Sequence, residues 1–85
     1  MGDSKSTPVA SLGEYRVGVD FNPSGSEQVN NIKERVADLI DDLEKVKTAH
    51  LNVSPEVSRL AALAQTAFEE GAMWAVKAIT KRPRT

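Results

Sequence analysis

Residues 54–81 read SPEVSRLAALAQTAFEEGAMWAVKAITK, a run of 28 residues with the composition of a helix. Ser54 can cap a helix, because its side chain accepts a hydrogen bond from an unpaired backbone N–H group of the first turn. Pro55 suits the first helical position, and Glu56 suits the positive end of the helix dipole. Pro83 cannot continue a helix. The sequence therefore predicts one long helix that ends near Lys81.

The composition of this helix indicates that it needs more than one neighbour. Between Leu60 and Ile79 the clearly polar side chains are few: Gln65, Thr66, Glu69, Glu70 and Lys77. One partner helix covers a single stripe of such a surface, so we expect packing on another helix of the chain and on copies of itself. Gly71 weakens a helix interior by roughly 0.5–1 kcal/mol, which close packing would offset. The alternative is that Gly71 is merely tolerated.

A first helix is expected after the loop Asn22-Pro23-Ser24-Gly25-Ser26, because Ser24 and Glu27 have the spacing of a capping box. Apolar residues then follow at intervals of three and four: Val29, Ile32, Val36, Leu39, Leu43 and Val46, widened by Ile40. Such a stripe packs lengthwise against another helix. The opposite face is charged, and Asp41 and Lys45 are spaced for an ion pair. After a turn at residues 52–54 the two helices form an antiparallel helical hairpin.

The segment from Glu14 to Phe21 alternates between apolar and other residues, which is the period of a β-strand. No second strand is predicted, and a lone strand leaves its backbone groups unpaired. We therefore expect an extended N-terminal arm that lies on the helices or pairs with another copy. Together with the two helices, this predicts a mainly α fold that assembles as an oligomer.

The chain has 85 residues and a mass of 9.2 kDa, enough for one domain. We divide it into a flexible tail (1–13), a helical-hairpin domain (14–82) and a C-terminal tail (83–85). A domain of this size buries only about 60% of the surface of its unfolded chain. It has no cysteine for a disulfide, and its single histidine argues against a zinc site. Oligomerisation is the remaining source of stability.

Charge and residue types exclude several functions. Lys and Arg number 11 against 12 Asp and Glu, a net charge of −1, which argues against binding to duplex nucleic acid. Neither a membrane-spanning run nor a secretory signal is evident, so we expect a cytosolic protein. His50 is expected in a turn, and Asp41 and Asp42 point about 100° apart on a helix. We predict no catalysis, no cofactor and no metal.

The loop before the first helix is a candidate anion site, since a helix N-terminus offers backbone N–H groups and a positive dipole end. Ser24 and Ser26 add hydroxyls, and Lys33 lies on the same helix face as Ser26. Tyr15 and Phe21 flank the loop and could stack on a nucleobase. These are the parts of a nucleotide site, without the pattern of a nucleotide hydrolase. The alternative is an ordinary helix cap with two core aromatics.

A second group of positive charges occupies the C-terminus: Lys77, Lys81, Arg82 and Arg84. The simpler interpretation is that they complement the negative end of the helix dipole and solubilise the tail. If copies of the chain meet near this end, the same residues form a basic ring that could bind a polyanion.

Two motifs carry a resemblance to a known family. They are the run Asp20-Phe21-Asn22-Pro23-Ser24-Gly25 with the Ile32-Lys33 pair, and AQTAFEEGAMWAVKA at residues 64–78. From Tyr15 to Arg82 the chain resembles small phage anti-CBASS proteins, which are cyclic-oligonucleotide sponges related to the Thoeris anti-defence sponges. The resemblance implies a hairpin that interlocks into a hexamer in the host bacterial cytoplasm. It also implies sequestration of cyclic dinucleotides, without cleavage, so that CBASS effectors stay inactive.

The resemblance also implies ligand-binding residues. Tyr15 matches the aromatic residue that stacks on bases between two protomers, with Phe21 as the alternative, and Lys33 matches the lysine that meets phosphate. Lys77 matches a basic residue at a three-fold junction that holds cyclic trinucleotides in some members. The full predicted set is Tyr15, Phe21, Asn22, Ser24, Ser26, Lys33, Lys77 and Lys81. The alternative function is a non-catalytic helical scaffold or protein-interaction module.

Overall fold

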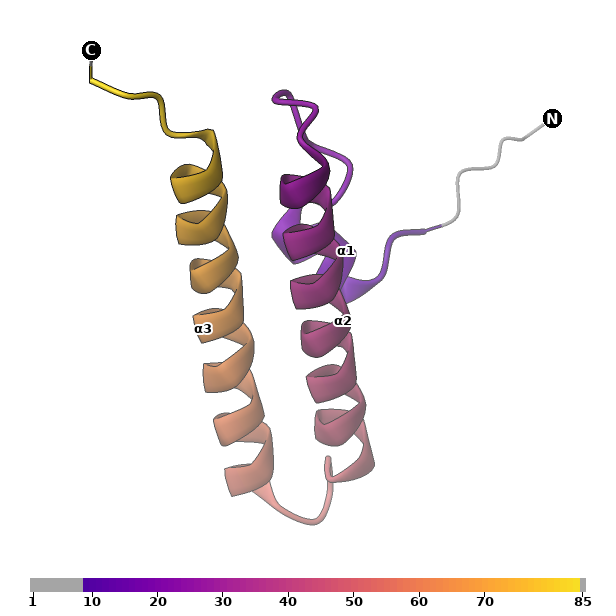
Figure 1. Ribbon diagram of the computed structural model, residues 1–85. Helices are drawn as coiled ribbons and strands as arrows, with labels where there is room; N and C mark the ends of the chain where they lie inside the picture. The colour runs from indigo at the N-terminus through magenta and orange to yellow at the C-terminus, as the bar shows by residue number, and fades with distance from the viewer. Residues whose placement is uncertain (1–8, 85) are drawn as a thin grey trace, which may run out of the picture.

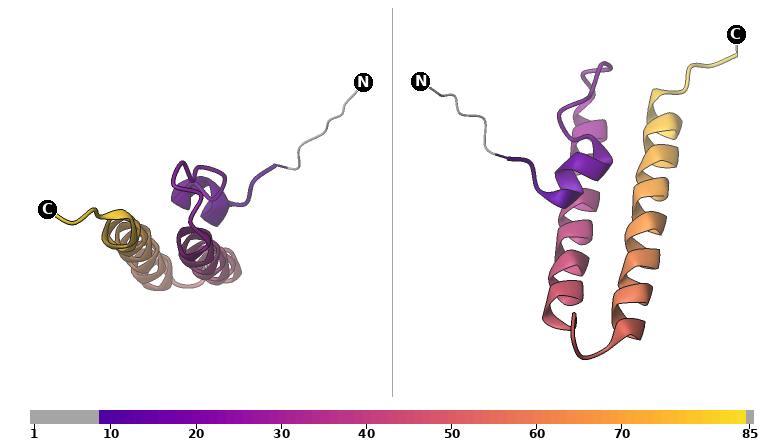
Figure 2. Two further views of the ribbon diagram at one scale, coloured as in Figure 1. Left: turned by 45° about the horizontal axis from the view of Figure 1, so that its top comes forward. Right: turned by 180° about the vertical axis from the view of Figure 1, so that it is seen from behind.

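Three helices make up the computed structural model, which describes residues 9–84. They are α1 (Leu12–Val17), α2 (Glu27–Ala49) and α3 (Pro55–Thr80). Figure 1 shows α2 and α3 side by side and antiparallel, joined by a short turn at one end. The predicted mainly α helical hairpin is confirmed. The short α1 packs on the half of α2 that is farther from this turn, as the views in Figures 1 and 2 agree.

The predicted extended arm at Glu14–Phe21 was wrong, because the chain there begins as a helix. Ser11 caps α1 by accepting from the backbone N–H of Glu14 at 3.1 Å, and the Glu14 carboxylate accepts from the Ser11 N–H at 2.9 Å. Gly18 ends the helix in the left-handed region at φ 73°. A helix satisfies its own backbone groups, whereas a strand without a partner cannot. Residues 9–84 contain no strand.

α1 is held against α2 by a close backbone approach at Gly13. A Cβ atom on Gly13 would lie 2.7 Å from the carbonyl carbon of Ala37 and would also overlap its oxygen, so only glycine fits there. The Gly13 N–H donates to Asp41 Oδ1 at 2.7 Å. Asp41 is therefore half-buried rather than part of a solvated face, and the expected Asp41–Lys45 ion pair is not among those of residues 9–84. Leu12 and Gly13 belong to α1, while residues 1–8 of the predicted tail lie outside the described part.

α2 begins two residues later than the predicted capping box. Ser26 is the cap and accepts from the Val29 N–H at 3.3 Å, whereas Ser24 accepts from the Ser26 N–H at 3.1 Å. Gly25, at φ 68°, turns the chain between them. α2 ends at Ala49, and His50 follows as its C-cap in the turn, as predicted.

The buried face of α2 matches the predicted apolar stripe only in part. Val29 and Ile40 are buried as expected, but Leu39 and Val46 are exposed, and the buried face includes Lys33 and Ala37 instead. The reason is α1, which covers α2 on the Ala37 side and so shifts the buried face around the helix.

α3 starts as predicted, with Ser54 accepting from the Val57 N–H at 3.3 Å and Pro55 in the first turn. Towards α2 it buries Ala61, Gln65 and Ala72. Gln65 is fully buried, and its amide donates to Ile40 O at 3.0 Å and to the Glu44 carboxylate at 3.1 Å. The hydrogen bond from Gln65 lowers the pKa of Glu44, because it favours the charged carboxylate.

The outer side of α3 carries exposed apolar residues that no part of residues 9–84 covers. They recur at intervals of three and four along the helix: Leu60, Leu63, Ala67, Gly71, Trp74 and Ala78. We call these six residues the α3 stripe. Open space surrounds the position that a Gly71 Cβ would take. No described helix is long and apolar enough to cross a membrane.

Candidate functional site: two grooves that share a buried lysine

Lys33 places a positive charge inside the protein, near the start of α2. Lys33 is only 7% exposed, and its ammonium donates to Gly18 O at 3.0 Å and to Phe21 O. The ammonium also lies 5.6 Å from the centroid of the Phe21 ring, within the range of a cation–π interaction. Among residues 9–84 no carboxylate forms an ion pair with it. A buried charge compensated only by neutral groups favours an anion nearby.

The loop before α2 is fixed by its own polar groups. Asn22 Nδ2 donates to Ser26 O at 2.9 Å and to Asn30 Oδ1 at 3.0 Å. The Ser24 hydroxyl donates to Asn22 Oδ1 at 2.6 Å, and the Ser26 hydroxyl accepts within the helix cap. This network rigidifies the loop that follows the Gly18–Phe21 turn. The Ser24 hydroxyl proton is engaged by Asn22, whereas the Ser26 hydroxyl only accepts and keeps its proton for a ligand.

One groove has a volume of about 220 Å³ and runs between this loop and the end of α3. Its lining residues are Phe21, Asn22, Pro23, Ser24, Val29, Lys33, Val76 and Thr80. Four of the residues that the sequence singled out thus come together here, from the loop and from α2: Phe21, Asn22, Ser24 and Lys33. We call this the loop groove.

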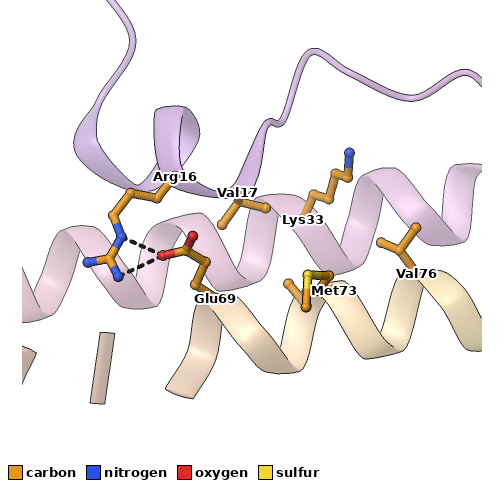
Figure 3. A pocket seen from close by; sticks show the side chains of 7 residues that line it. Arg16, Val17, Lys33, Glu69, Met73 and Val76 are labelled. Carbon is orange, nitrogen blue, oxygen red and sulfur yellow. Dashed lines mark hydrogen bonds and ion pairs between the residues drawn. The ribbon is translucent and has the colours of Figure 1, made fainter. Parts of the chain in front are cut away.

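A second groove, of about 260 Å³, lies between α1 and α3. Its lining residues are Arg16, Val17, Lys33, Glu69, Ala72, Met73 and Val76, six of which Figure 3 labels. We call it the α1 groove. Because Lys33 and Val76 line both grooves, the two grooves adjoin each other along these side chains.

Arg16 forms the polar end of the α1 groove together with Glu69. Its Nε and Nη2 atoms both lie 2.7 Å from Glu69 Oε1, and Nη2 lies 3.3 Å from the Thr66 hydroxyl. Figure 3 shows this pair at one end of the groove and Lys33 on the other side of Val17. The pair also ties α1 to α3, which α1 otherwise touches little.

The remaining predicted site residues lie elsewhere. Tyr15 is 80% exposed on α1, and Ser26 caps α2; neither lines the two grooves. Lys77 is exposed, with its ammonium 5.6 Å from the centroid of the Trp74 ring. Lys81 follows the end of α3 and is exposed. Within one chain the structure does not bring Tyr15, Lys77 or Lys81 to Lys33, and their roles stay predictions.

Sequence reasoning missed Arg16, Glu69 and Met73 as lining residues. Treating residues 14–21 as a strand placed Arg16 on the side away from the apolar residues. The signal that could have corrected this is the capping-box spacing of Ser11 and Glu14, with Gly18 at the distance of a helix C-cap. Nothing local marks Glu69, because its role depends on where α1 docks.

Residues 9–84 contain no cluster of three or more His, Cys, Asp or Glu side chains that could hold a metal ion. His50 lies at the turn end of α2, whereas Lys33 lies near the opposite end of that helix. The grooves offer cations, a carboxylate, hydroxyls, an amide and apolar walls.

The comparison with known protein families agrees with the helical hairpin. A family model described as "Acb2/Tad1, hairpin domain" matches residues 14–80, which include α2, all of α3 and most of α1. No curated protein and no solved structure shows significant similarity to the chain.

Proposed function

This chain belongs to the Acb2/Tad1 hairpin family of anti-CBASS and anti-Thoeris sponge proteins, and we propose that it binds and sequesters cyclic oligonucleotides in the host bacterial cytoplasm. Cyclic dinucleotides are the expected ligands at the two grooves, with cyclic trinucleotides as further candidates. Sequestration without cleavage would keep these messengers from CBASS effectors. Such a sponge acts by mass action, so it must bind tightly and be present in excess over the ligand.

The observation that carries this proposal is the buried Lys33, whose side chain lines both grooves. Phosphate is the natural counter-ion for a cation whose present partners are two carbonyl oxygens and an aromatic ring. A cyclic dinucleotide has two phosphates in its ring and a base on each side. A phosphate at Lys33 would let one base enter the loop groove and the other the α1 groove.

The predicted aromatic residues fit this arrangement in different ways. Phe21 lines the loop groove, where its ring could stack on a base, and Asn22 and Ser24 offer polar contacts beside it. Tyr15 is exposed on α1, so it would contact a ligand held between two chains. Both aromatics therefore remain part of the proposed site.

We also propose that the working form is a homo-oligomer, with a hexamer as the expected size. Support comes from the α3 stripe, an exposed apolar surface along a full-length helix. Burying apolar surface of this kind is worth about 25 cal/mol per Å². Ala67, Gly71 and Ala78 would allow two helices to approach closely. Lys77 and Lys81 would then meet their copies and form the proposed trinucleotide site.

The test is equilibrium binding of 3′,3′-cyclic di-GMP, cyclic di-AMP and cyclic GMP–AMP to the wild type and to Lys33→Met. We expect the wild type to bind at least one of them and Lys33→Met to bind it at least about tenfold more weakly, because a charge-assisted contact to phosphate is lost. Lys45→Met is the matched control, since Lys45 is an exposed lysine of α2 outside both grooves. Helix content by circular dichroism checks that both variants fold.

Native mass spectrometry of the complex gives the stoichiometry, and denaturation then shows whether the released ligand is intact. Equal binding by Lys33→Met and Lys45→Met would contradict the Lys33 site. Release of a cleaved product would contradict sequestration.

The alternative function, a scaffold or protein-interaction module, is favoured by the same exposed α3 stripe. It predicts that no cyclic dinucleotide or trinucleotide binds, and that Tyr15→Ala with Lys33→Ala leaves the function unchanged as long as the protein assembles. The binding experiment therefore separates the two functions.

A further inference from the structure

The α1 groove combines apolar walls with one polar end. Val17, Met73 and Val76 line its length, while Arg16 and Glu69 stand together at the end away from Lys33 (Figure 3). Nucleobases need this combination, because they have flat apolar faces and an edge of hydrogen-bond donors and acceptors. A nucleobase that enters the α1 groove with its polar edge first would place that edge against the Arg16–Glu69 pair.

The pair leaves hydrogen-bonding capacity for a ligand. Both bonds from Arg16 go to Glu69 Oε1, and no hydrogen bond to Oε2 occurs among residues 9–84. The Glu69 side chain is 43% exposed, so a ligand can reach it. Arg16 also carries more N–H groups than its bonds to Glu69 and Thr66 use. The end of the groove therefore presents a donor next to an unsatisfied carboxylate oxygen.

Guanine matches this order of groups better than the other bases. Its Watson–Crick edge has an acceptor, O6, followed by two donors, the N1–H and N2–H groups. Arg16 can donate to O6 while Glu69 Oε2 accepts from the two donors. Uracil would turn its O2 atom towards the carboxylate, and adenine has no donor pair.

We propose that Arg16 and Glu69 select a guanine base in the α1 groove. This inference rests on the proposed function, since it concerns one base of a nucleotide whose phosphate lies at Lys33. It assigns to Arg16 and Glu69 a role beyond holding α1 on α3. Guanine recognition and helix docking make different predictions, because loosened docking would weaken the binding of every nucleotide alike.

The experiment compares 3′,3′-cyclic di-GMP with 3′,3′-cyclic di-UMP by equilibrium titration of the full chain. The wild type should bind cyclic di-GMP more tightly. Glu69→Gln should weaken the binding of cyclic di-GMP by about tenfold, the size expected for a lost pair of base-edge contacts. It should not weaken the binding of cyclic di-UMP, because the neutral amide no longer repels uracil O2. Glu56→Gln is the matched control. Like Glu69, Glu56 lies on α3 and pairs with an arginine, Arg59, but this pair lies near the turn and outside both grooves.

Arg16→Lys provides a second variant, since lysine keeps a charge beside Glu69 but loses the fork of N–H groups. Arg16→Lys should also weaken the binding of cyclic di-GMP more than that of cyclic di-UMP. If Glu69→Gln and Arg16→Lys lower the affinity for both ligands equally, guanine selection is overturned and only the docking role of the pair remains. A wild type that binds both ligands equally would overturn it while leaving the sponge function intact. Absence of binding to any cyclic nucleotide would overturn the proposed function and this inference with it.

Discussion

The two long helices differ in how much of their surface the chain itself covers. α2 packs against both α3 and α1, and its Ile40 is fully buried. α3 has α2 along one side and touches α1 chiefly through Glu69 and Thr66, so Met73 and Trp74 stay 61% and 56% exposed. Yet α3 is the more apolar helix. Burial in this chain thus follows the number of neighbours that a helix has, and the apolar helix has too few.

Loosening α1 from α2 should change the stability of the chain most. Gly13→Ala should lower the free energy of unfolding by about 2–3 kcal/mol, because the new Cβ would overlap the backbone of Ala37. Backbone cannot turn aside as a side chain can, so α1 must move away. Urea unfolding followed by circular dichroism measures the change. An unchanged midpoint would show that α1 does not dock as described.

The same substitution at Gly71 tests the exposed side of α3. Gly71→Ala should stabilise the separated chain by about 0.5–1 kcal/mol, because Gly71 faces open space and alanine favours a helix. It should also weaken self-association if the α3 stripe is where copies meet. Unfolding at low protein concentration measures the first effect, and light scattering across a concentration series measures the second. Association that is unaltered by Gly71→Ala would argue against a close helix approach at this position.

The smallest expected effect concerns the contact that the two helices share. The hydrogen bond from Gln65, and to a smaller extent Lys47, lowers the pKa of Glu44 from its ordinary value of 4.5. A carboxyl whose folded pKa is lower than its unfolded pKa stabilises the fold above the unfolded value, and this stability is lost as the pH falls through the folded value. The Glu44 side chain is 43% exposed, so solvent keeps the contribution small.

Replacing the hydrogen-bond donor isolates this contribution. Gln65→Met should remove most of the lowering, so its unfolding free energy should fall less than that of the wild type between pH 7 and pH 3. The pair Glu56–Arg59, which also lowers a glutamate pKa, is present in both proteins and cancels. Parallel pH profiles would contradict the role of Gln65.

Much of the fold could be predicted because its signals are local. Ser54 and Pro55 start α3 where expected, and the polar turn with His50 separates two helices whose periodicity spans more than twenty residues each. The error at residues 14–21 came from weighting alternation over a capping box that begins in the expected tail. A six-residue helix offers less than two turns of periodicity, so its caps are the stronger signal.

The candidate site was predicted in part. Phe21, Asn22, Ser24 and Lys33 are close in sequence, and one helix start brings them to the loop groove. Local sequence could not show that Lys33 is buried among carbonyl oxygens, since Gly18 O and Phe21 O reach it only through the turn after α1.

The two long helices, their antiparallel pairing and the apolar excess of α3 follow from the amino-acid sequence alone, because they depend on caps, periodicity and composition. The tertiary structure decided which face of α2 is buried, which serine caps it, and that Arg16 meets Glu69 across 53 residues. The buried face of α2 and the Arg16–Glu69 pair depend on the docking of α1 at Gly13, a backbone contact between residues far apart in the chain. Local propensity carries no information about such a contact, whereas packing in three dimensions selects it.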